Sequence, residues 1–555
     1  MNAMRILSAA EMQACDRITT ERFGVPSIDL MRAAGRAVAA VAHQQFPRAR
    51  RVTVLCGRGN NGGDGMMAAR LLAREGLRVT AILFGGPEAL KGDAAIAWYE
   101  LTNPMRCRVS VVTSARELNQ QMDALAADLI VDALVGTGFK PPLKGLALAA
   151  LEWIGPNSAP ILAVDLPSGC PADTTAASVT ERVFPADAVV TFTAPKPAHI
   201  FGQLTRTWNQ PVVVAPIGSP DEAIASSLKL EWAGSATALT HARRAAAANK
   251  GNFGHVLVIG GTFGSAGGKA GAPAMTALGA MRAGAGLVTA AVPAPALPIV
   301  ATIAPELMTM PLQATAAGQI SSRNLTASRT AALMAGKTVL ALGPGLGQSP
   351  ETVKFTTGLL SSTEIPVVLD ADALNILSTN TALLGKLARR GTRTLVLTPH
   401  PGEMARLAKI TTNQVQTNRL DVARNFAQRY SVTLVLKGAR TLIAHPDGTV
   451  AVNTTGNPAM AKGGSGDLLT GLVAGLLAQH PSNPAVAVEA AVYIHGLAAD
   501  LAVRAGDEHT LLATDSLAHL SQAFRFYSHA ANGYVWLQGL PADRYPDSPV
   551  HEAYR

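Results

Sequence analysis

A chain of 555 residues is too long for one hydrophobic core, and it indicates two large domains with short appendages. Its hydrophobic fraction of 48% and charged fraction of 15% exclude a disordered chain and are typical of α/β domains with buried parallel strands. The net charge of +9 is not gathered in a basic run, so small anionic ligands are favoured and no nucleic-acid partner is expected.

The four cysteines are widely spaced and contain no Cys-x-x-Cys pair, which is typical of free thiols in a reducing compartment. The N-terminus lacks the basic-then-apolar pattern of a secretion signal. No apolar stretch is expected to reach membrane-spanning length, because the longest candidate, which begins at Leu468, is short and interrupted by glycines. These features predict a cytoplasmic protein with no membrane partner.

Two series of short apolar runs, rich in β-branched residues, alternate with alanine-rich helical stretches. The first series is 51–56, 79–84, 129–134, 161–166, 188–192 and 212–215, and the second is 255–259, 287–292, 339–342, 366–370, 394–398 and 433–436. The alternation predicts two three-layer α/β domains with parallel sheets. We expect a first domain over 1–222, a second over 226–527, and a C-terminal extension of unknown role over 528–555.

In the first series, polar groups follow several strands. Residues 57–65 contain Gly-x-Gly-x-x-Gly, which is a weak dinucleotide signal because the next strand ends without an acidic residue for a ribose. Asn61, Asp132, Asp165 and Ser168 are expected to share one crevice, since the carboxyl ends of parallel strands converge. Such oxygen ligands suit a monovalent cation or Mg²⁺, and Asp165 is alternatively an acid–base residue. Each aspartate alone is equally typical of a cap or turn.

Four motifs in this region occur together: Leu-Met-Arg-Ala-Ala-Gly at 30–35, Asn-Asn-Gly-Gly-Asp-Gly at 60–65, Val-Asp-Ala-Leu-Val-Gly-Thr-Gly at 131–138 and Val-Asp-Leu-Pro-Ser-Gly at 164–169. They resemble the YjeF N-terminal family, which epimerises hydrated NADH and NADPH (NADHX and NADPHX). The resemblance implies a Rossmann-like domain, catalysis by Asp165, and K⁺ bound by Asn61, Asp132 and Ser168. The substrate-binding residues that it implies are Asn60, Asn61, Gly62, Gly63, Asp64, Gly136, Thr137, Gly138, Phe139, Lys140, Pro141, Pro142 and Asp165.

The segment 457–467 is the most informative part of the second series. Three glycines in four residues, 463–466, lead directly into an apolar run that predicts a buried helix. Free N–H groups at a helix N-terminus attract phosphate, and Asp467 is placed to deprotonate a hydroxyl while Gly464 and Gly466 stabilise charge. The alternative is a tight turn in which Asp467 caps the helix.

Other strand ends of the second series carry the motifs 268–272, 343–347, 369–375, 398–403 and 437–441. In this order they resemble the ribokinase-related NAD(P)HX dehydratase family, although the loop 263–268 is a few residues longer than usual. The resemblance implies that Ala272, Gly345, His400 and Asp467 contact the hydrated dinucleotide, with Asp467 catalytic. It further implies that Lys437, Gly438, Ala439, Arg440, Thr441 and Gly466 bind a nucleotide, which is ADP with Mg²⁺.

The two resemblances together imply a bifunctional repair enzyme. It would interconvert the R and S hydrates and dehydrate the S form at the expense of ADP, giving AMP and phosphate. A homo-oligomer is expected. Two alternatives stay open: a vitamin or sugar kinase with the same Gly-Ser-Gly-Asp, and a binding scaffold, because YjeF-type domains also occur in mRNA-decapping scaffold proteins.

Overall fold

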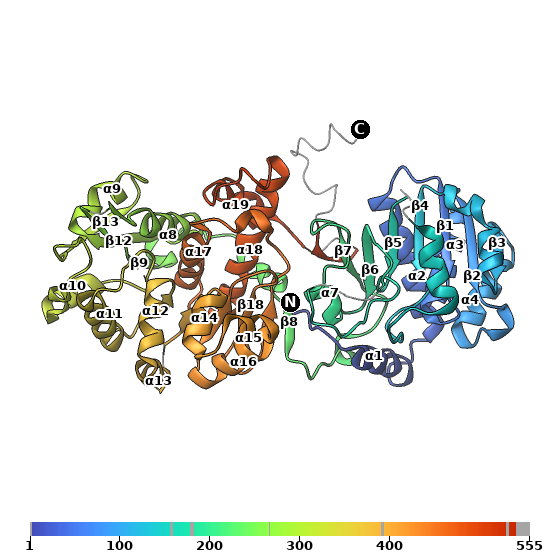
Figure 1. The fold of residues 1–555 in the computed structure, drawn as a ribbon, viewed down its shortest axis with the longest axis horizontal. Coiled ribbons are helices and arrows are strands. Elements are labelled where there is room, and N and C mark those ends of the chain that lie inside the picture. The colour runs from blue at the N-terminus through green and yellow to red at the C-terminus, as the bar shows by residue number, and fades with distance from the viewer. Residues whose placement is uncertain are drawn as a thin grey trace. The chain divides into compact units, whose positions relative to one another are not determined.

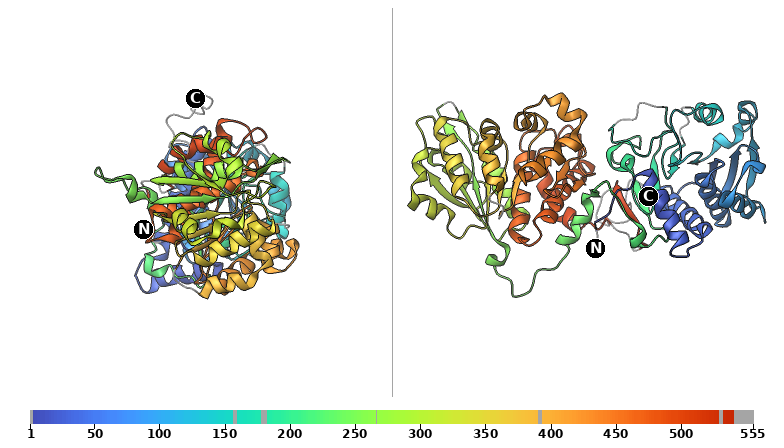
Figure 2. Two further views of the ribbon diagram at one scale, coloured as in Figure 1. Left: turned by 90° about the vertical axis from the view of Figure 1, so that its left-hand side faces the viewer. Right: turned by 90° about the horizontal axis from the view of Figure 1, so that it is seen from below.

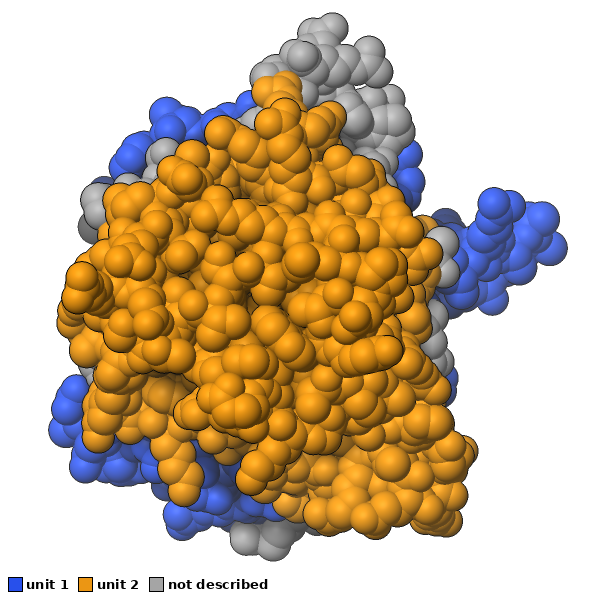
Figure 3. Space-filling view, turned by 90° about the vertical axis from the view of Figure 1, so that its right-hand side faces the viewer, with its two compact units in different colours: residues 1–3, 231–526 blue, residues 4–230, 527–555 orange. Residues whose placement is uncertain are grey.

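The computed structural model describes residues 3–155, 159–177, 182–265, 267–389, 393–528 and 532–539. They form two compact α/β units (Figure 1), which confirms the predicted fold class. The N-terminal unit contains residues 4–230 and the described residues after 526, and the C-terminal unit contains 231–526 together with Ala3. Figure 3 draws the two units in different colours.

Eight strands of the described residues form the sheet of the N-terminal unit, in the order β20-β7-β6-β5-β4-β1-β2-β3. Their bounds are β1 Arg51–Cys56, β2 Arg78–Phe84, β3 Arg108–Val112, β4 Leu129–Ala133, β5 Ile161–Val164, β6 Ala188–Phe192, β7 Val212–Ala215 and β20 Val535–Gln538. Neighbouring strands from β7 to β3 are parallel. The six predicted strands of this unit are therefore all present, and their carboxyl ends lie at one edge of the sheet.

The helices of this unit are α1 Ala9–Glu21, α2 Ser27–Gln45, α3 Asn60–Arg74, α4 Gly92–Thr102, α5 Ala115–Asn119, α6 Gly145–Ile154 and α7 Pro197–Phe201. Ser8 begins α1 with a capping box, because its hydroxyl accepts from the Glu11 N–H and the Glu11 carboxylate accepts from the Ser8 N–H. Helices α2 and α3 pack closely, since an added Cβ on Gly35 would lie 2.4 Å from the Met67 Cβ. This packing holds the start of α3 against the sheet.

The C-terminal segment returns to the first sheet. Strand β20 pairs antiparallel with β7, and Trp536 and Leu537 are 1% and 0% exposed. The described part of the expected 528–555 extension is therefore an edge strand of the N-terminal unit; residues 529–531 and 540–555 lie outside the described residues. The division between the two compact units falls at 230–231.

In the C-terminal unit, ten strands of the described residues have the order β13-β12-β9-β14-β15-β16-β17-β18-β19-β8. The strands are β8 Leu230–Trp232, β9 His255–Ile259, β12 Leu287–Pro293, β13 Met308–Leu312, β14 Val339–Leu342, β15 Val367–Leu369, β16 Leu395–Leu397, β17 Thr433–Leu436, β18 Leu442–Ala444 and β19 Val450–Val452, with a separate hairpin of β10 Phe263–Gly264 and β11 Gly267–Gly268. The pairs from β13 to β17 are parallel, and β17, β18 and β19 are antiparallel.

Helices surround this sheet in the views of Figure 2. They are α8 Gly271–Arg282, α9 Leu297–Ala301, α10 Ala327–Met334, α11 Pro350–Ser362, α12 Asp372–Thr379, α13 Thr381–Arg389, α14 Pro401–Ala408, α15 Thr412–Thr417, α16 Arg419–Tyr430, α17 Ser465–Gln479, α18 Pro484–Ala505 and α19 Asp515–Arg525. Helix α17 packs on α8 and on strands β9, β14 and β15. An apolar helix between a sheet and another helix has no solvent-facing side, which explains why α17 lacks a polar face.

Helix α18 corrects the expectation that no apolar stretch reaches membrane-spanning length. Its 22 residues are long and apolar enough to cross a membrane by length and composition. However, 83% of its apolar window is buried within the unit, and Tyr493 meets Trp232 edge to face with ring centroids 5.6 Å apart. Because it also packs on α17 and α19, α18 is a core helix of the C-terminal unit.

Candidate active sites

A cavity of about 920 Å³ lies at the carboxyl ends of the parallel strands in the N-terminal unit. The predicted substrate-binding residues that line it are Asn60, Asn61, Asp64, Gly136, Thr137, Gly138, Phe139, Lys140 and Asp165. Gly62, Gly63, Pro141 and Pro142 are not in its lining. An added Cβ on Gly62 would lie 1.9 Å from the Gly57 carbonyl oxygen, and one on Gly63 would lie 2.6 Å from the Met31 side chain. Both glycines therefore allow close packing at the start of α3.

Asp165 follows β5 with a left-handed backbone, φ +63°, which is uncommon outside glycine and is found at strained functional positions. Its Oδ1 accepts hydrogen bonds from Lys196 Nζ and Thr191 Oγ1, both at 2.8 Å. Burial acts to raise the pKa of Asp165, but Lys196, His199 and the Thr191 hydrogen bond together outweigh burial, and the net pKa lies below its ordinary value. The carboxylate is therefore ionised at neutral pH and available as a base.

Asp132 and Ser168 form a fully buried pair. The Ser168 N–H donates to Asp132 Oδ2 at 2.8 Å and the Ser168 hydroxyl to Oδ1 at 2.6 Å, yet burial still raises the pKa of Asp132 to about 6. The buried Oδ1 of Asn61 has no hydrogen-bond partner, and its side chain lies against Gly136, next to the Val135 N–H that donates to Ser168 Oγ. An orphaned amide oxygen, a buried carboxylate and a hydroxyl are oxygen donors that fit K⁺.

Sequence reasoning missed several charged residues of this cavity, among them Lys196 and Asp16. Lys196 is 2% exposed and follows β6, so the argument from strand ends that selected Asp165 applies to it equally. Asp16 belongs to α1, which precedes the first strand and carries no recognisable motif. Burial raises the pKa of Asp16 to about 6; Lys196 acts to lower it and Asp165 to raise it.

The glycine loop of the C-terminal unit leads into α17, whose residues from Leu468 to Ala478 are all buried. Gly464 occupies the N-cap position with φ +96°, a conformation that glycine adopts without strain. Asp467 lies inside the first turn, so the alternative that it caps the helix is wrong. Burial raises the pKa of Asp467 to about 6; Asp370 adds to the rise, and Lys437 and Lys269 oppose it.

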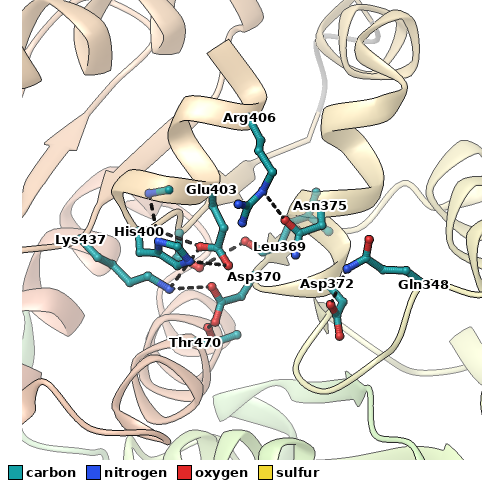
Figure 4. A network of polar contacts seen from close by, with 12 residues as sticks. Gln348, Leu369, Asp370, Asp372, Asn375, His400, Glu403, Arg406, Lys437 and Thr470 are labelled. Atoms are coloured by element: carbon teal, nitrogen blue, oxygen red, sulfur yellow. Dashed lines mark hydrogen bonds and ion pairs between the residues drawn. The ribbon is translucent and has the colours of Figure 1, made fainter. Parts of the chain in front are cut away.

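Figure 4 shows a network of charged residues in the C-terminal unit, centred on Asp370 at the end of β15. Lys437 Nζ donates to Asp370 Oδ1 at 2.8 Å, and the Thr470 hydroxyl donates to Oδ2 at 2.9 Å. Lys437 Nζ also lies 4.0 Å from Glu403 Oε2. An added Cβ on Gly466 would lie 3.3 Å from Lys437 Nζ. The first turn of α17, β15 and the residue after β17 therefore meet at one point.

His400 and Glu403 begin α14 with reciprocal hydrogen bonds. His400 Nδ1 accepts from the Gly402 N–H at 3.0 Å, and Glu403 Oε2 accepts from the His400 N–H at 2.8 Å. Burial raises the pKa of Glu403 to about 6, with Lys437 opposing it. Burial lowers the pKa of His400, helped by the charges of Lys437 and Arg406.

The nucleotide-binding residues predicted after β17 form a tight turn. Gly438 and Arg440 have φ of +135° and +54°, and the Thr441 hydroxyl donates to the Gly438 carbonyl at 2.9 Å. The Arg440 guanidinium is buried and donates to the Thr454 carbonyl at 3.0 Å. Asp370 holds the Lys437 side chain and the Thr454 carbonyl holds that of Arg440, so both cationic side chains of the turn are fixed in place.

Ala272 and Gly345 lie close together, as the sequence motifs predict. An added Cβ on Gly345 would lie 3.2 Å from the Ala272 Cβ and 2.7 Å from the Lys269 carbonyl oxygen. Lys269 Nζ is 3.6 Å from Asp372 Oδ2, which also accepts from the Gly347 N–H at 2.9 Å. Sequence reasoning quoted the motifs that contain Lys269, Asp370 and Glu403 but assigned these residues no role.

Comparison with known proteins identifies each half of the chain. Residues 27–198 match the family described as YjeF-related protein N-terminus, and residues 256–522 match the family described as NAD(P)H-hydrate dehydratase. A crystal structure of the ADP/ATP-dependent NAD(P)H-hydrate dehydratase from Bacillus subtilis, co-crystallized with ATP/Mg²⁺, is 31% identical, covers 53% of this chain and 96% of its own, and has a TM-score of 0.44.

Several relatives match the chain over most of its length and share one name. The bifunctional NAD(P)H-hydrate repair enzyme Nnr of Moorella thermoacetica is 40% identical over 94% of this chain and 97% of its own length. The enzymes of the same name from Coxiella burnetii and Escherichia coli are 36% and 34% identical, over 92% and 93% of this chain and 97% and 93% of theirs. The chain therefore belongs to the family of bifunctional NAD(P)H-hydrate repair enzymes, with an epimerase half and a dehydratase half.

Proposed function

We propose that the C-terminal unit dehydrates the S hydrate by phosphoryl transfer from ADP, with Asp467 as the base. Asp467 carries the proposal, because it is a carboxylate of raised pKa in the first turn of a buried helix, where N–H groups bind phosphate. The hydroxyl of the hydrated ring is a poor leaving group. Asp467 removes its proton as the oxygen attacks the terminal phosphoryl group, and phosphate then leaves as the ring nitrogen donates its lone pair. The adjacent ring carbon then loses a proton to solvent, which restores the C=C bond of the reduced ring.

The side chains around Asp467 suit this chemistry. Lys437 forms an ion pair with Asp370 and adjoins Gly466, so it supplies fixed positive charge near the transferred group. Mg²⁺ is usually held by the nucleotide phosphates and one or two carboxylates, and it neutralises charge on the transferred group. Glu403 fits the role of that carboxylate, because it is buried and faces Lys437. Ala272, Gly345 and His400 bind the dinucleotide, and the turn 437–441 binds the adenine nucleotide.

The donor assay tests this proposal. Hydrated NADH of S configuration is incubated with ADP or ATP, each free of the other, and absorbance, AMP, ADP and phosphate are followed. We expect regenerated NADH, AMP and phosphate in equal amounts, with a higher kcat/KM for ADP than for ATP. A clear preference for ATP overturns the choice of donor but not dehydration. A stable phosphorylated product without release of phosphate indicates a kinase instead.

The raised pKa of Asp467 predicts an acidic limb in the pH dependence of dehydration. A base must be ionised, so activity is lost as the pH falls through about 6, whereas an ordinary aspartate would stay ionised down to about 4. The measurement is kcat for dehydration from about pH 5 to about pH 8. Because the pKa of Glu403 is also raised to about 6, Glu403→Gln is the control. If the limb disappears in Glu403→Gln, Asp467 is not its source.

For the N-terminal unit we propose epimerisation at the cavity that Asp165 lines. Asp165 takes a proton from the hydroxyl of the hydrated ring while Asn60, Asp64, Lys140 and the loop 136–142 bind the dinucleotide. The residues Asn61, Asp132 and Ser168 hold K⁺, which fits because Asn61 offers a buried oxygen without a partner. Bound there, K⁺ supplies charge beside the substrate-binding loop.

Removal of K⁺ is expected to destabilise the N-terminal unit and slow epimerisation. A cation that binds only the folded state at about 100 times its Kd stabilises it by about 2.7 kcal/mol. Thermal unfolding is compared in KCl and in choline chloride of equal ionic strength, for wild type, Asn61→Ala and Asn60→Ala. The K⁺ dependence should vanish in Asn61→Ala and persist in Asn60→Ala, since Asn60 is no ligand. Equal unfolding temperatures of wild type in both salts contradict the site.

The state of the cysteines bears on the cellular compartment. All four cysteines are free thiols, three of them buried, which favours a reducing compartment such as the cytoplasm. The substrates are small molecules, NADHX, NADPHX and ADP. A homo-oligomer stays a prediction, and size-exclusion chromatography with light scattering on the purified chain measures it.

A further inference from the structure

Besides Asp165, four carboxylates line the epimerase cavity, Asp16, Glu21, Asp64 and Asp93, and the reaction needs a second proton-transfer group. The hydroxyl-bearing carbon of the hydrated ring is bonded to the ring nitrogen, so it is a carbinolamine. Inversion by ring opening removes the hydroxyl proton, forms a C=O bond, breaks the C–N bond and leaves its electron pair on nitrogen. That nitrogen must receive a proton in the same step. One group accepts the first proton as a base, and another group must supply the second proton as an acid.

We infer that Asp16 is this acid, paired with Asp165 as the base of the epimerase. The inference rests on the proposed site of epimerisation. Asp16 and Asp165 line the same cavity, although they come from α1 and from the end of β5. On α1, Met12, Asp16 and Thr20 all line the cavity, so one face of the helix is turned toward it.

The side chain of Asp16 has no structural bond that explains its position. Its Oδ1 is buried without a hydrogen-bond partner, and the contact from the Thr20 hydroxyl goes to the Asp16 backbone carbonyl. Lys196 neutralises Asp165, which holds a 2.8 Å ion pair with it. A carboxyl group without an ion-paired cation keeps its proton to a higher pH than one that has such a partner, so Asp16 is the more readily protonated of the two.

The electrostatics agree with this division of roles. Burial raises the pKa of Asp16 to about 6, while the pKa of Asp165 lies below its ordinary value. After ring opening, rotation of the aldehyde presents its other face. The nitrogen attacks that face and returns its proton to Asp16, while the acid form of Asp165 returns its proton to oxygen. No proton or electron is consumed, and both carboxyl groups end in their starting states.

The test uses the full chain and a mixture of R and S hydrate with ADP. NADH returns in a fast phase from the S form and in a slow phase limited by epimerisation. Asp16→Asn should slow the second phase at least about 100-fold and leave the first unchanged, because an amide cannot donate this proton. Asp16→Glu should restore much of the rate. The control is Asp29→Asn, a carboxylate of α2 that is outside the cavity lining and pairs with Arg32.

Each outcome decides one claim. A second phase of Asp16→Asn within threefold of wild type overturns the role of Asp16, and so does a raised KM with unchanged kcat, which indicates binding alone. If Asp16→Asn does not fold, the rate of Asp16→Glu decides: restored epimerisation supports the acid role, and complete loss in a folded Asp16→Glu overturns it. If Asp165→Asn also keeps the second phase, epimerisation does not occur at this cavity and the proposed site itself fails.

Discussion

Asp467→Asn is expected to abolish dehydration and leave epimer exchange at the wild-type rate. The amide keeps the size of the side chain but cannot accept the hydroxyl proton, and loss of a general base of this kind lowers kcat by about 10²–10⁴-fold. The substitution should not lower the stability of the fold. Burial and the nearby Asp370 raise the pKa of Asp467, so its negative charge destabilises the folded protein, and the uncharged amide removes that cost. The measurement is NADH recovery from S hydrate, with chiral separation of R and S for the epimerase.

The matched control is Asp421→Asn, which removes an exposed carboxylate on α16 of the same unit. It should change neither activity. Thermal unfolding of Asp467→Asn should lie at or above the wild-type temperature. If the variant regenerates NADH at near the wild-type rate, Asp467 is not the base. If it loses activity because unfolding occurs at a lower temperature, the carboxylate has a structural role that its raised pKa argues against.

Most buried strands of both units could be predicted from the sequence, but the buried strands β18 and β19 and several edge strands could not. Strands such as β6 and β14 are buried at every position, and the chain must therefore be apolar there. Edge strand β3 has the exposed residues Arg108 and Val111, and edge strand β13 likewise has the exposed Met308. One solvent-facing side removes the apolar run that marks a strand. Strand β20 is short, and it is recognised only by its pairing with β7, which lies far away in the sequence.

The candidate sites divide in the same way. Glycine-rich turns and strand-end aspartates leave a local pattern, so Asp165 and Asp467 could be found in the sequence. Asp370 ends a strand beside Lys437, but the ion pair between them joins residues far apart in the chain. Asp16 is on an amphipathic helix where an aspartate is ordinary. Only its burial beside Asp165 distinguishes it, and burial is a property of the folded chain.

Asp165→Asn is expected to strand the R hydrate while the S hydrate is repaired at the wild-type rate. Asparagine tolerates the left-handed backbone at this position almost as well as aspartate, so the strand end should keep its shape, whereas alanine would add strain. The amide can still accept hydrogen bonds from Lys196 and Thr191, but it cannot take a proton. Repair of a mixed hydrate should therefore stop once the S form is consumed, followed only by slow spontaneous exchange.

Lys196→Met tests the same assignment in a second way, because it should change the pKa of the base, Asp165, while Asp165 itself stays in place. Removing the lysine leaves a buried carboxylate without its cation, and such losses destabilise proteins by about 3–5 kcal/mol unless the group takes up a proton. The pKa of Asp165 should then rise, since Lys196 is the largest of the influences that lower it. Epimerisation by Lys196→Met should fail near neutral pH and recover in part as the pH rises, while Asp165→Asn recovers at no pH. Loss of repair on both epimers in either variant would point instead to misfolding of the chain.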